Sequence, residues 1–166
     1  MAFRKKQKSQ SNYETPEAMF RDRLDRQIPG PLSHQSDVIR QYQQSAFDKS
    51  DVALELPTGS GKTLVGLLIG EFRRVTEGKR VLYLCPTNQL VQQVCEQAKR
   101  KYAIDARPFV GSIPTYTVSN KSAFQTGEAI AVSTYSALFN TNPFFKNPNL
   151  IILDDAHAAE NYIAKN

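Results

Sequence analysis

The residues best suited to chemistry lie in one stretch, positions 56–63, which reads Leu-Pro-Thr-Gly-Ser-Gly-Lys-Thr. Gly59 and Gly61 permit positive φ angles, which turn successive backbone N–H groups toward one anion, and the helix expected to follow adds its partial positive charge. Lys62 is placed to reach the β- and γ-phosphates of a nucleotide, and Thr63 to put its hydroxyl on Mg²⁺. The residues predicted to bind nucleotide here are Pro57, Thr58, Gly59, Ser60, Gly61, Lys62 and Thr63.

The surroundings of this stretch favour a phosphate-binding loop. Val52, Leu54 and Leu56 alternate before it in the manner of a strand, and a long apolar helix pattern follows it. The general pattern asks for glycine where Leu56 stands, but the anion-binding geometry does not depend on that position. Gly-Ser-Gly is often only a flexible turn. Lys-Thr directly after it, with a strand and a helix on either side, favours the functional interpretation.

A second candidate site is the pair Asp154 and Asp155, which follows the apolar run Leu-Ile-Ile-Leu at 150–153. In phosphate-loop enzymes a carboxylate at the end of a buried strand near the loop holds Mg²⁺ through water, and an acid beside it can orient the attacking water. We therefore expect Asp154 at the metal with Thr63, and Asp155 and Lys62 as the catalytic residues. Two acids after a strand are weak evidence alone, and strong evidence when paired with a phosphate loop.

These residues need a scaffold that brings them together. Short apolar runs predict strands at 52–56, 80–85, 106–110, 129–133 and 150–153. Helices are expected from Thr15 to about Gln27, from Ser36 or Asp37 through Ala46, from the phosphate loop to Gly78 and from Pro86 to Tyr102. This alternation predicts a doubly wound α/β fold with a mostly parallel sheet flanked by helices. Residues 114–126 are polar and show no clear helix or strand pattern. Residues 140–149 are predicted to form a loop that packs Phe144 and Phe145 against the rest of the domain.

Composition bounds the class of protein. The 166 residues, 40% of them hydrophobic, fit one globular domain. No apolar run reaches the roughly 18 residues that a membrane span needs, and the N-terminus lacks the apolar core of a signal peptide, so we expect a cytoplasmic protein. Cys85 and Cys95 both fall on apolar positions, and we expect core residues rather than a zinc site or a disulfide.

The net charge of +5 comes largely from the N-terminus, because Arg4, Lys5, Lys6 and Lys8 lie in a segment with no acidic residue. The rest of the chain is nearly balanced. We expect residues 1–13 to be a disordered basic tail, with contact to a phosphate backbone as the alternative reading. Residues 14–35 are expected to form a helical extension, and residues 36–166 the ATP-binding domain.

Several short segments resemble, in the same order, the motifs of superfamily 2 helicases of the DEAD/DEAH type. They are the phosphate loop at 56–63, Cys-Pro-Thr-Asn-Gln-Leu-Val-Gln-Gln at 85–93, Ser-Thr-Tyr at 133–135 and Asp-Asp-Ala-His at 154–157. Upstream, Ile-Arg-Gln-Tyr-Gln at 39–43 resembles the segment whose glutamine reads adenine in that superfamily. The resemblance covers residues 38–157, most of the chain.

The resemblance implies a RecA-like first motor domain that binds ATP and Mg²⁺ and acts on DNA or RNA. It places Gln43 at adenine and His157 in coupling between the nucleotide site and the rest of the motor. A nucleic-acid backbone is expected near Pro86, Thr87, Gln92 and Thr134. Phe109 and Tyr135 are expected to be core or loop anchors rather than platforms for stacked bases, because no basic cluster surrounds them.

Two departures from the family pattern bear on activity. Asp155 stands where the family usually has Glu, which shortens the expected base by one methylene. Family members also continue with a Ser-Ala-Thr-like motif and a second RecA-like domain that supplies arginine fingers, so we expect a front fragment, incomplete at its C-terminus, with weak turnover or none. The alternative is a nucleotide-binding or interaction module without significant hydrolysis. A small phosphate-loop kinase is disfavoured, because the C-terminal part lacks an arginine-bearing lid.

Overall fold

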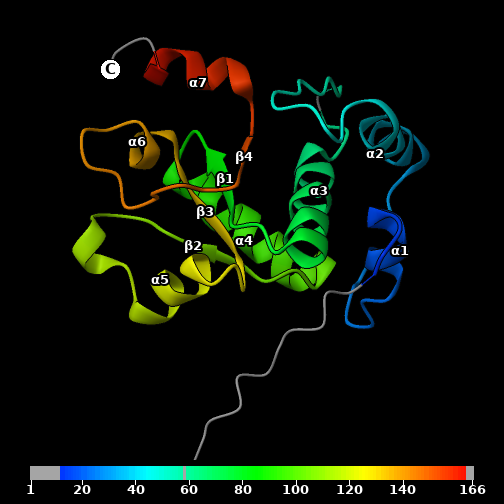
Figure 1. Ribbon diagram of the computed structural model, residues 1–166, viewed down its shortest axis with the longest axis horizontal. Coiled ribbons are helices and arrows are strands. Elements are labelled where there is room, and N and C mark those ends of the chain that lie inside the picture. Colours follow the sequence, from blue (N-terminus) through cyan, green and yellow to red (C-terminus); the bar gives the residue numbers. More distant parts are fainter. Residues whose placement is uncertain (1–11, 58, 164–166) are drawn as a thin grey trace, which may run out of the picture.

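The computed structural model describes residues 12–57 and 59–163, in which helices and strands alternate along most of the chain (Figure 1). Thr15 caps the first helix through its side chain, and Thr87 and Thr117 cap two others in the same way. The helices are α1 (Pro16–Arg21), α2 (Ser33–Ser45), α3 (Lys62–Glu77), α4 (Asn88–Tyr102), the 3₁₀ turn η1 (Ile113–Thr115), α5 (Val118–Gln125), α6 (Tyr135–Leu138) and α7 (Ala156–Ile163). None of these helices is long and apolar enough to cross a membrane.

The strands of the described residues form one parallel sheet in the order β2-β3-β1-β4. Cys85 pairs with Thr134, and Leu84 pairs with Leu153. Because parallel strands end at the same edge of a sheet, the segments that follow β1, β3 and β4 meet there. β4 lies at one end of the order. The strands are β1 (Val81–Cys85), β2 (Ala106–Pro108), β3 (Ile130–Thr134) and β4 (Leu150–Leu153).

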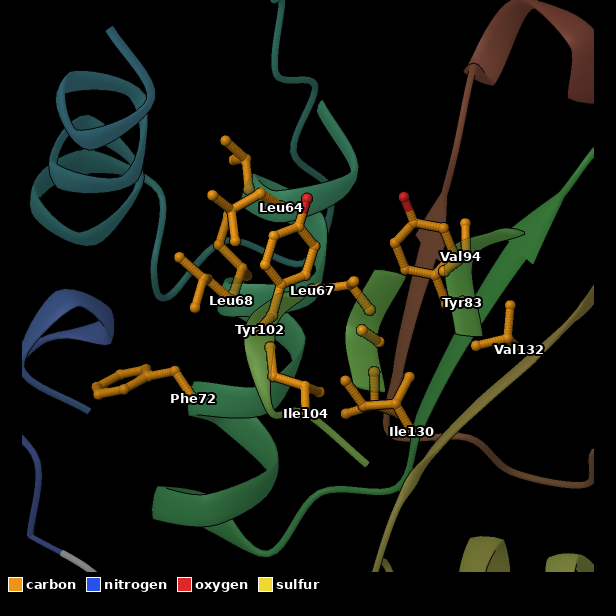
Figure 2. Close-up of a cluster of buried hydrophobic side chains, with 14 of the residues drawn as sticks. Leu64, Leu67, Leu68, Phe72, Tyr83, Val94, Tyr102, Ile104, Ile130 and Val132 are labelled. Carbon is orange, nitrogen blue, oxygen red and sulfur yellow. The ribbon is translucent and has the colours of Figure 1, made fainter. Parts of the chain in front are cut away.

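Successive side chains of β1 point to opposite faces of the sheet, and both faces are covered by other residues. Tyr83 and Cys85 pack with α3 and α4 in a large core, part of which is drawn in Figure 2. Leu82 and Leu84 pack into a second core, which includes Phe109, Tyr116, Phe124, Tyr135 and Phe145. The predicted α/β architecture is confirmed, and so is the burial of both cysteines and of the aromatic loop residue Phe145.

Two glycines let α3, which follows the phosphate loop, pack directly on the sheet. A Cβ at Gly66 would lie 2.9 Å from Cε2 of Tyr83, and a Cβ at Gly70 would lie 2.9 Å from Cδ1 of Ile152. Real Cβ atoms do not approach other atoms so closely, so any larger residue would push the helix outward. Gly66 and Gly70 therefore allow a close approach between α3 and the sheet.

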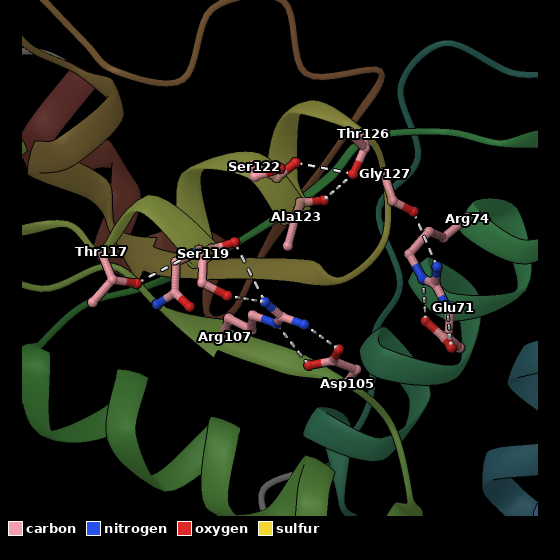
Figure 3. Close-up of polar contacts among 11 residues, drawn as sticks. Glu71, Arg74, Asp105, Arg107, Thr117, Ser119, Ser122, Ala123, Thr126 and Gly127 are labelled. Carbon is pink, nitrogen blue, oxygen red and sulfur yellow. Dashed lines mark hydrogen bonds and ion pairs between the residues drawn. The ribbon is translucent and has the colours of Figure 1, made fainter. Parts of the chain in front are cut away.

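A buried ion cluster fastens the N-terminal segment to α3. Glu71 is 1% exposed, and its carboxylate accepts hydrogen bonds from Arg23 and Arg74. Arg23 also donates to the carbonyl of Ala103, and Arg74 to the carbonyl of Gly127 at 3.0 Å, as Figure 3 shows for Arg74. One carboxylate therefore joins the segment after α1, the start of the loop after α4 and the turn before β3.

The prediction of a strand at 52–56 is wrong. These residues follow an irregular path, and Val52 and Leu54 are 40% and 39% exposed. An alternating pattern needs a neighbouring strand to satisfy its backbone groups, and no described strand pairs with this segment. The sheet of the described residues therefore has four strands rather than the five expected.

Helix boundaries also differ from the predicted ones. α2 begins at Ser33 rather than near Ser36, because the Oε1 atom of Gln35 accepts the N–H of Leu32 at 2.8 Å and stabilises an earlier start. α1 ends at Arg21, six residues before the expected Gln27. The unassigned stretch 114–126 contains most of η1 and all of α5.

Candidate nucleotide site and nucleic-acid cleft

The phosphate loop has the backbone geometry that its glycines permit. Gly59 and Gly61 adopt φ angles of 77° and 76°, in the left-handed region where residues with a Cβ are strained. Gly61 is the N-cap of the 16-residue helix α3, and Lys62 is the first helical residue. The unpaired N–H groups of that helix end therefore face the loop beside a lysine, which is an arrangement suited to anions. Thr58, predicted to bind nucleotide, lies outside the described residues.

Two residues of α2 hold the loop from the side. Gln35 is buried and donates from Nε2 to the carbonyl of Ser60 at 2.7 Å, and Nε2 of His34 lies 3.0 Å from the same oxygen. A Cβ at Gly61 would lie 2.3 Å from Nε2 of Gln35, so the glycine is needed for this contact. Sequence reasoning missed Gln35, because a glutamine near a helix start looks like a solvated residue.

Gln43, the glutamine predicted to read adenine, lies two turns further along α2. Its Nε2 donates to the carbonyl of Glu14 at 3.1 Å, and the side chain is half-buried. Its contact therefore joins α2 to the residues before α1. In the described structure it is Gln35, rather than Gln43, that touches the phosphate loop. The adenine-reading role of Gln43 stays a prediction.

The carboxyl end of β4 brings Asp154 to the phosphate loop. The backbone N–H of Asp154 continues the sheet by donating to Leu84 at 2.9 Å. Burial and then the charge of Asp154 raise the pKa of the Tyr83 phenol, and Thr63 opposes that rise, so the buried phenol lies near both residues predicted at the metal. Burial raises the pKa of the Asp154 carboxyl, which the hydrogen bond from Tyr83 and the charge of Lys62 partly offset.

Asp155 occupies a special backbone position. Its φ of 60° is left-handed, a region that Asp enters more readily than most residues. The hydroxyl of Tyr135 donates to the carbonyl oxygens of both Asp154 and Asp155, the latter at 2.9 Å. The Asp155 carboxylate is exposed, as is His157 in the first turn of α7.

A cleft of about 500 Å³ opens at the same edge of the sheet. Thr134 lines it, as predicted for a nucleic-acid contact, and Oγ1 of Thr134 lies 3.0 Å from Oγ of Ser136. Pro86 and Thr87 directly precede the lining residue Asn88, whereas Gln92 is exposed on α4 and does not line the cleft. The lining consists of Asn88, Phe109, Gly111, Ser112, Ile113, Pro114, Tyr116, Thr134, Ser136, Ala137, Asn140 and Asn142.

Sequence reasoning missed most of this lining. Gly111 has a φ of 89°, and a Cβ there would lie 2.9 Å from Oγ1 of Thr115, so the turn before η1 requires glycine. Gly-Ser in a polar loop after a strand was the available signal for this turn. Phe109 and Tyr135 are 2% and 0% exposed, which confirms that they are anchors rather than stacking platforms.

The residues at the loop fit a magnesium nucleotide. Mg²⁺ binds one or two carboxylates together with substrate phosphates and water, and Asp154 and Thr63 supply oxygen ligands of that kind. The Oγ atom of Ser60 is buried without a hydrogen-bond partner among the described residues, so this hydroxyl remains available to form a hydrogen bond with a ligand. The described residues contain no group of three or more His, Cys, Asp and Glu that could hold a metal by themselves.

A phosphate loop, a strand-end carboxylate and a parallel sheet with helices on both faces define a RecA-like, helicase-type motor domain. Residues 33–164 match the DEAD/DEAH box helicase family, and the chain belongs to that family.

Two yeast proteins are similar in sequence. One is the XPB/SSL2 helicase/translocase subunit of general transcription and DNA repair factor IIH from Saccharomyces cerevisiae, 32% identical over 113 residues that cover 64% of this chain and 12% of that protein. The other is the XPB subunit of the same factor from Schizosaccharomyces pombe, 32% identical over 113 residues that cover 64% of this chain and 13% of that protein. The chain thus spans a small part of the length of both relatives.

Proposed function

We propose that this chain is the ATP-binding motor domain of a nucleic-acid-dependent ATPase, with hydrolysis of MgATP coupled to translocation in a longer protein. The observation that supports the proposal is the phosphate loop itself, in which two left-handed glycines precede Lys62 at the N-terminus of α3. Asp154, at the end of β4, is near enough for the charge of Lys62 to act on its carboxyl.

In this proposal the loop residues bind and orient the phosphates. The left-handed glycines direct backbone N–H groups inward, and Gln35 holds the loop in that shape through Ser60. Lys62 supplies the positive charge at the β- and γ-phosphates, and Thr63 and Asp154 hold the metal, which when bound neutralises charge that develops on the phosphates. Gln43 is assigned to adenine on the basis of the family motif.

Asp155 is assigned to orienting the attacking water. Its exposed carboxylate follows the metal-binding Asp154 directly, and the Tyr135 hydroxyl fixes the backbone that carries both. Because Asp is one methylene shorter than the Glu that is usual here, we expect slow hydrolysis rather than none. His157, in the first turn of α7, is assigned to coupling.

The cleft is assigned to a single-stranded nucleic-acid backbone. Its lining carries hydroxyl and amide side chains and no charged residue, and Asn88 begins the 15-residue helix α4. Hydroxyls, amides and helix N-termini bind phosphate oxygens without reading sequence. Pro86, Thr87 and Gln92 extend the same track along α4, and binding is expected to be weak and indifferent to sequence.

Calorimetric titration with ATP and Mg²⁺ tests the nucleotide site. Lys62→Ala should abolish measurable affinity, because no other loop side chain carries a positive charge, and an exposed lysine contributes little to folding. Lys99→Ala, which removes an exposed lysine from α4, is the matched control and should bind like the wild type. Equal ATP binding by wild type and Lys62→Ala would refute the assignment. Steady-state ATPase assays with and without single-stranded DNA or RNA then separate a motor from a module that binds without turnover.

A further inference from the structure

Three consecutive residues at the end of β3 face two different sites. Thr134 and Ser136 line the cleft, and their hydroxyls lie 3.0 Å apart. Tyr135, between them, is fully buried in the second core, and its hydroxyl reaches the carbonyl oxygens of Asp154 and Asp155. The residue between the two cleft hydroxyls is therefore hydrogen-bonded to the turn that carries both carboxylates.

We propose that Tyr135 is a positioning residue that couples occupancy of the cleft by a single-stranded nucleic acid to the placement of the carboxylates of Asp154 and Asp155. This inference rests on the proposed function, because it assumes that the cleft takes the nucleic acid and that the carboxylates serve the nucleotide. It assigns to Tyr135 a role beyond that of a core anchor.

The contact is suited to transmission because a single hydroxyl hydrogen serves two acceptors. Displacement of the Tyr135 hydroxyl leaves the carbonyl oxygen of Asp154 to be satisfied elsewhere, so the turn must follow the tyrosine or rearrange, whereas the carbonyl of Asp155 keeps the N–H of Ala158 at 3.0 Å. Asp155 can rearrange, since its φ of 60° is a sparsely populated conformation that the surrounding contacts must hold in place. Displacement of the Tyr135 hydroxyl therefore favours relaxation of Asp155 to an ordinary backbone conformation.

Packing contacts hold the Tyr135 ring in place between the two sites. The ring packs in the second core with Leu84, and its centroid lies 5.7 Å from that of Tyr162 on α7. α7 begins directly after Asp155, so the same ring contacts the helix that the carboxylate turn leads into. A shift at the start of α6 thus reaches α7 and the turn through one side chain.

The test is the coupling between two ligands, measured by binding alone. A labelled single-stranded oligonucleotide, as DNA and as RNA, is titrated with and without Mg²⁺ and a non-hydrolysable ATP analogue. In the wild type the analogue should change oligonucleotide affinity at least about fivefold, in the range usual for coupled sites. Tyr135→Phe removes only the hydroxyl and should bring the coupling factor close to one, with the affinity of the variant for each ligand alone as the reference.

Tyr102→Phe is the matched control, because it removes the hydroxyl of another buried tyrosine, at the end of α4, and should keep the wild-type coupling. Coupling in Tyr135→Phe equal to that of the wild type overturns the inference. Independent binding of the two ligands to the wild type also overturns it, while the proposed function stands. If the wild type binds neither ligand, the proposed function itself fails.

A measurement on the wild type keeps the inference testable if the variant does not fold. Hydrogen exchange of the amides from Asp154 to Ala158 should change when the oligonucleotide binds in the absence of nucleotide. Unchanged exchange in this segment, with the oligonucleotide bound, overturns the inference.

Discussion

At the scale of single residues, the carboxylate of Asp154 shows a conflict between stability and function. Burial raises its pKa, and the adjacent Asp155 adds to the effect. An acid whose folded-state pKa lies above its unfolded value binds more protons when folded, so stability falls as the pH rises through that interval. In the metal-free protein at neutral pH, the ionised Asp154 carboxylate therefore lowers the free energy of unfolding by the full cost of its burial.

We therefore predict that Asp154→Asn stabilises the metal-free protein at neutral pH while it destroys Mg²⁺-dependent ATP affinity. The amide keeps an acceptor for Tyr83 and carries no desolvated charge. The melting temperature should rise by about 2–4 °C for each kcal/mol relieved, and the gain should vanish at a pH below both pKa values. Thermal melts in EDTA at several pH values measure it, with the exposed Asp25→Asn as the control.

Asp155→Asn should leave MgATP affinity almost unchanged, because it removes only the group assigned to the water. A loss of affinity as large as that in Asp154→Asn would show that the two carboxylates share one role.

At the scale of elements, the residue contacts explain what could be predicted from the sequence. β1, β3, β4, α3 and α4 follow from apolar periodicity, because each buries a face that its own pattern reveals. The segment at 52–56 has a strand's alternation, but alternation cannot show whether a neighbouring strand is present. Gln35 could not be found, because its importance comes from its contact with Ser60, which is distant in sequence. The turn at Gly111 has a local cause, its positive φ and its contact with Thr115, but Gly-Ser was its only sequence signal.

Glu71 provides a prediction at this scale, since it joins α3 to the segment after α1. Glu71→Ala leaves Arg23 and Arg74, with side chains 21% and 13% exposed, without their shared carboxylate. Removing one partner of a buried ion pair costs about 3–5 kcal/mol, so urea denaturation should show a loss of that size. Glu96→Ala breaks an exposed pair with Arg100 and should cost less than about 1 kcal/mol. Similar losses in both variants would contradict a structural role for the cluster.

At the scale of the whole molecule, the fold and the candidate site have one origin. Parallel strands with aligned ends gather the segments after β1, β3 and β4 at a single edge, although Pro86 and Asp154, which directly follow β1 and β4, are 68 positions apart in the chain. The sequence motifs predict candidate site residues in these segments, because the residue types and spacing of each motif are local. The cleft was only partly predicted, since its far wall comes from the loops after β2 and α6 that have no periodic pattern.

Among the described residues no strand pairs with the outer side of β4, and this has a consequence for how the molecule behaves at high concentration. Ile151 and Leu153 are 42% and 36% exposed there, beside backbone groups that can accept another strand. Unprotected apolar edges of this kind template association between chains. Sedimentation velocity should show concentration-dependent self-association that Ile151→Lys reduces. Leu24→Lys, which places the same charge at a loop residue 91% exposed, should not change it. We therefore expect the colloidal stability of the protein to depend on the edge of the strand that leads into Asp154.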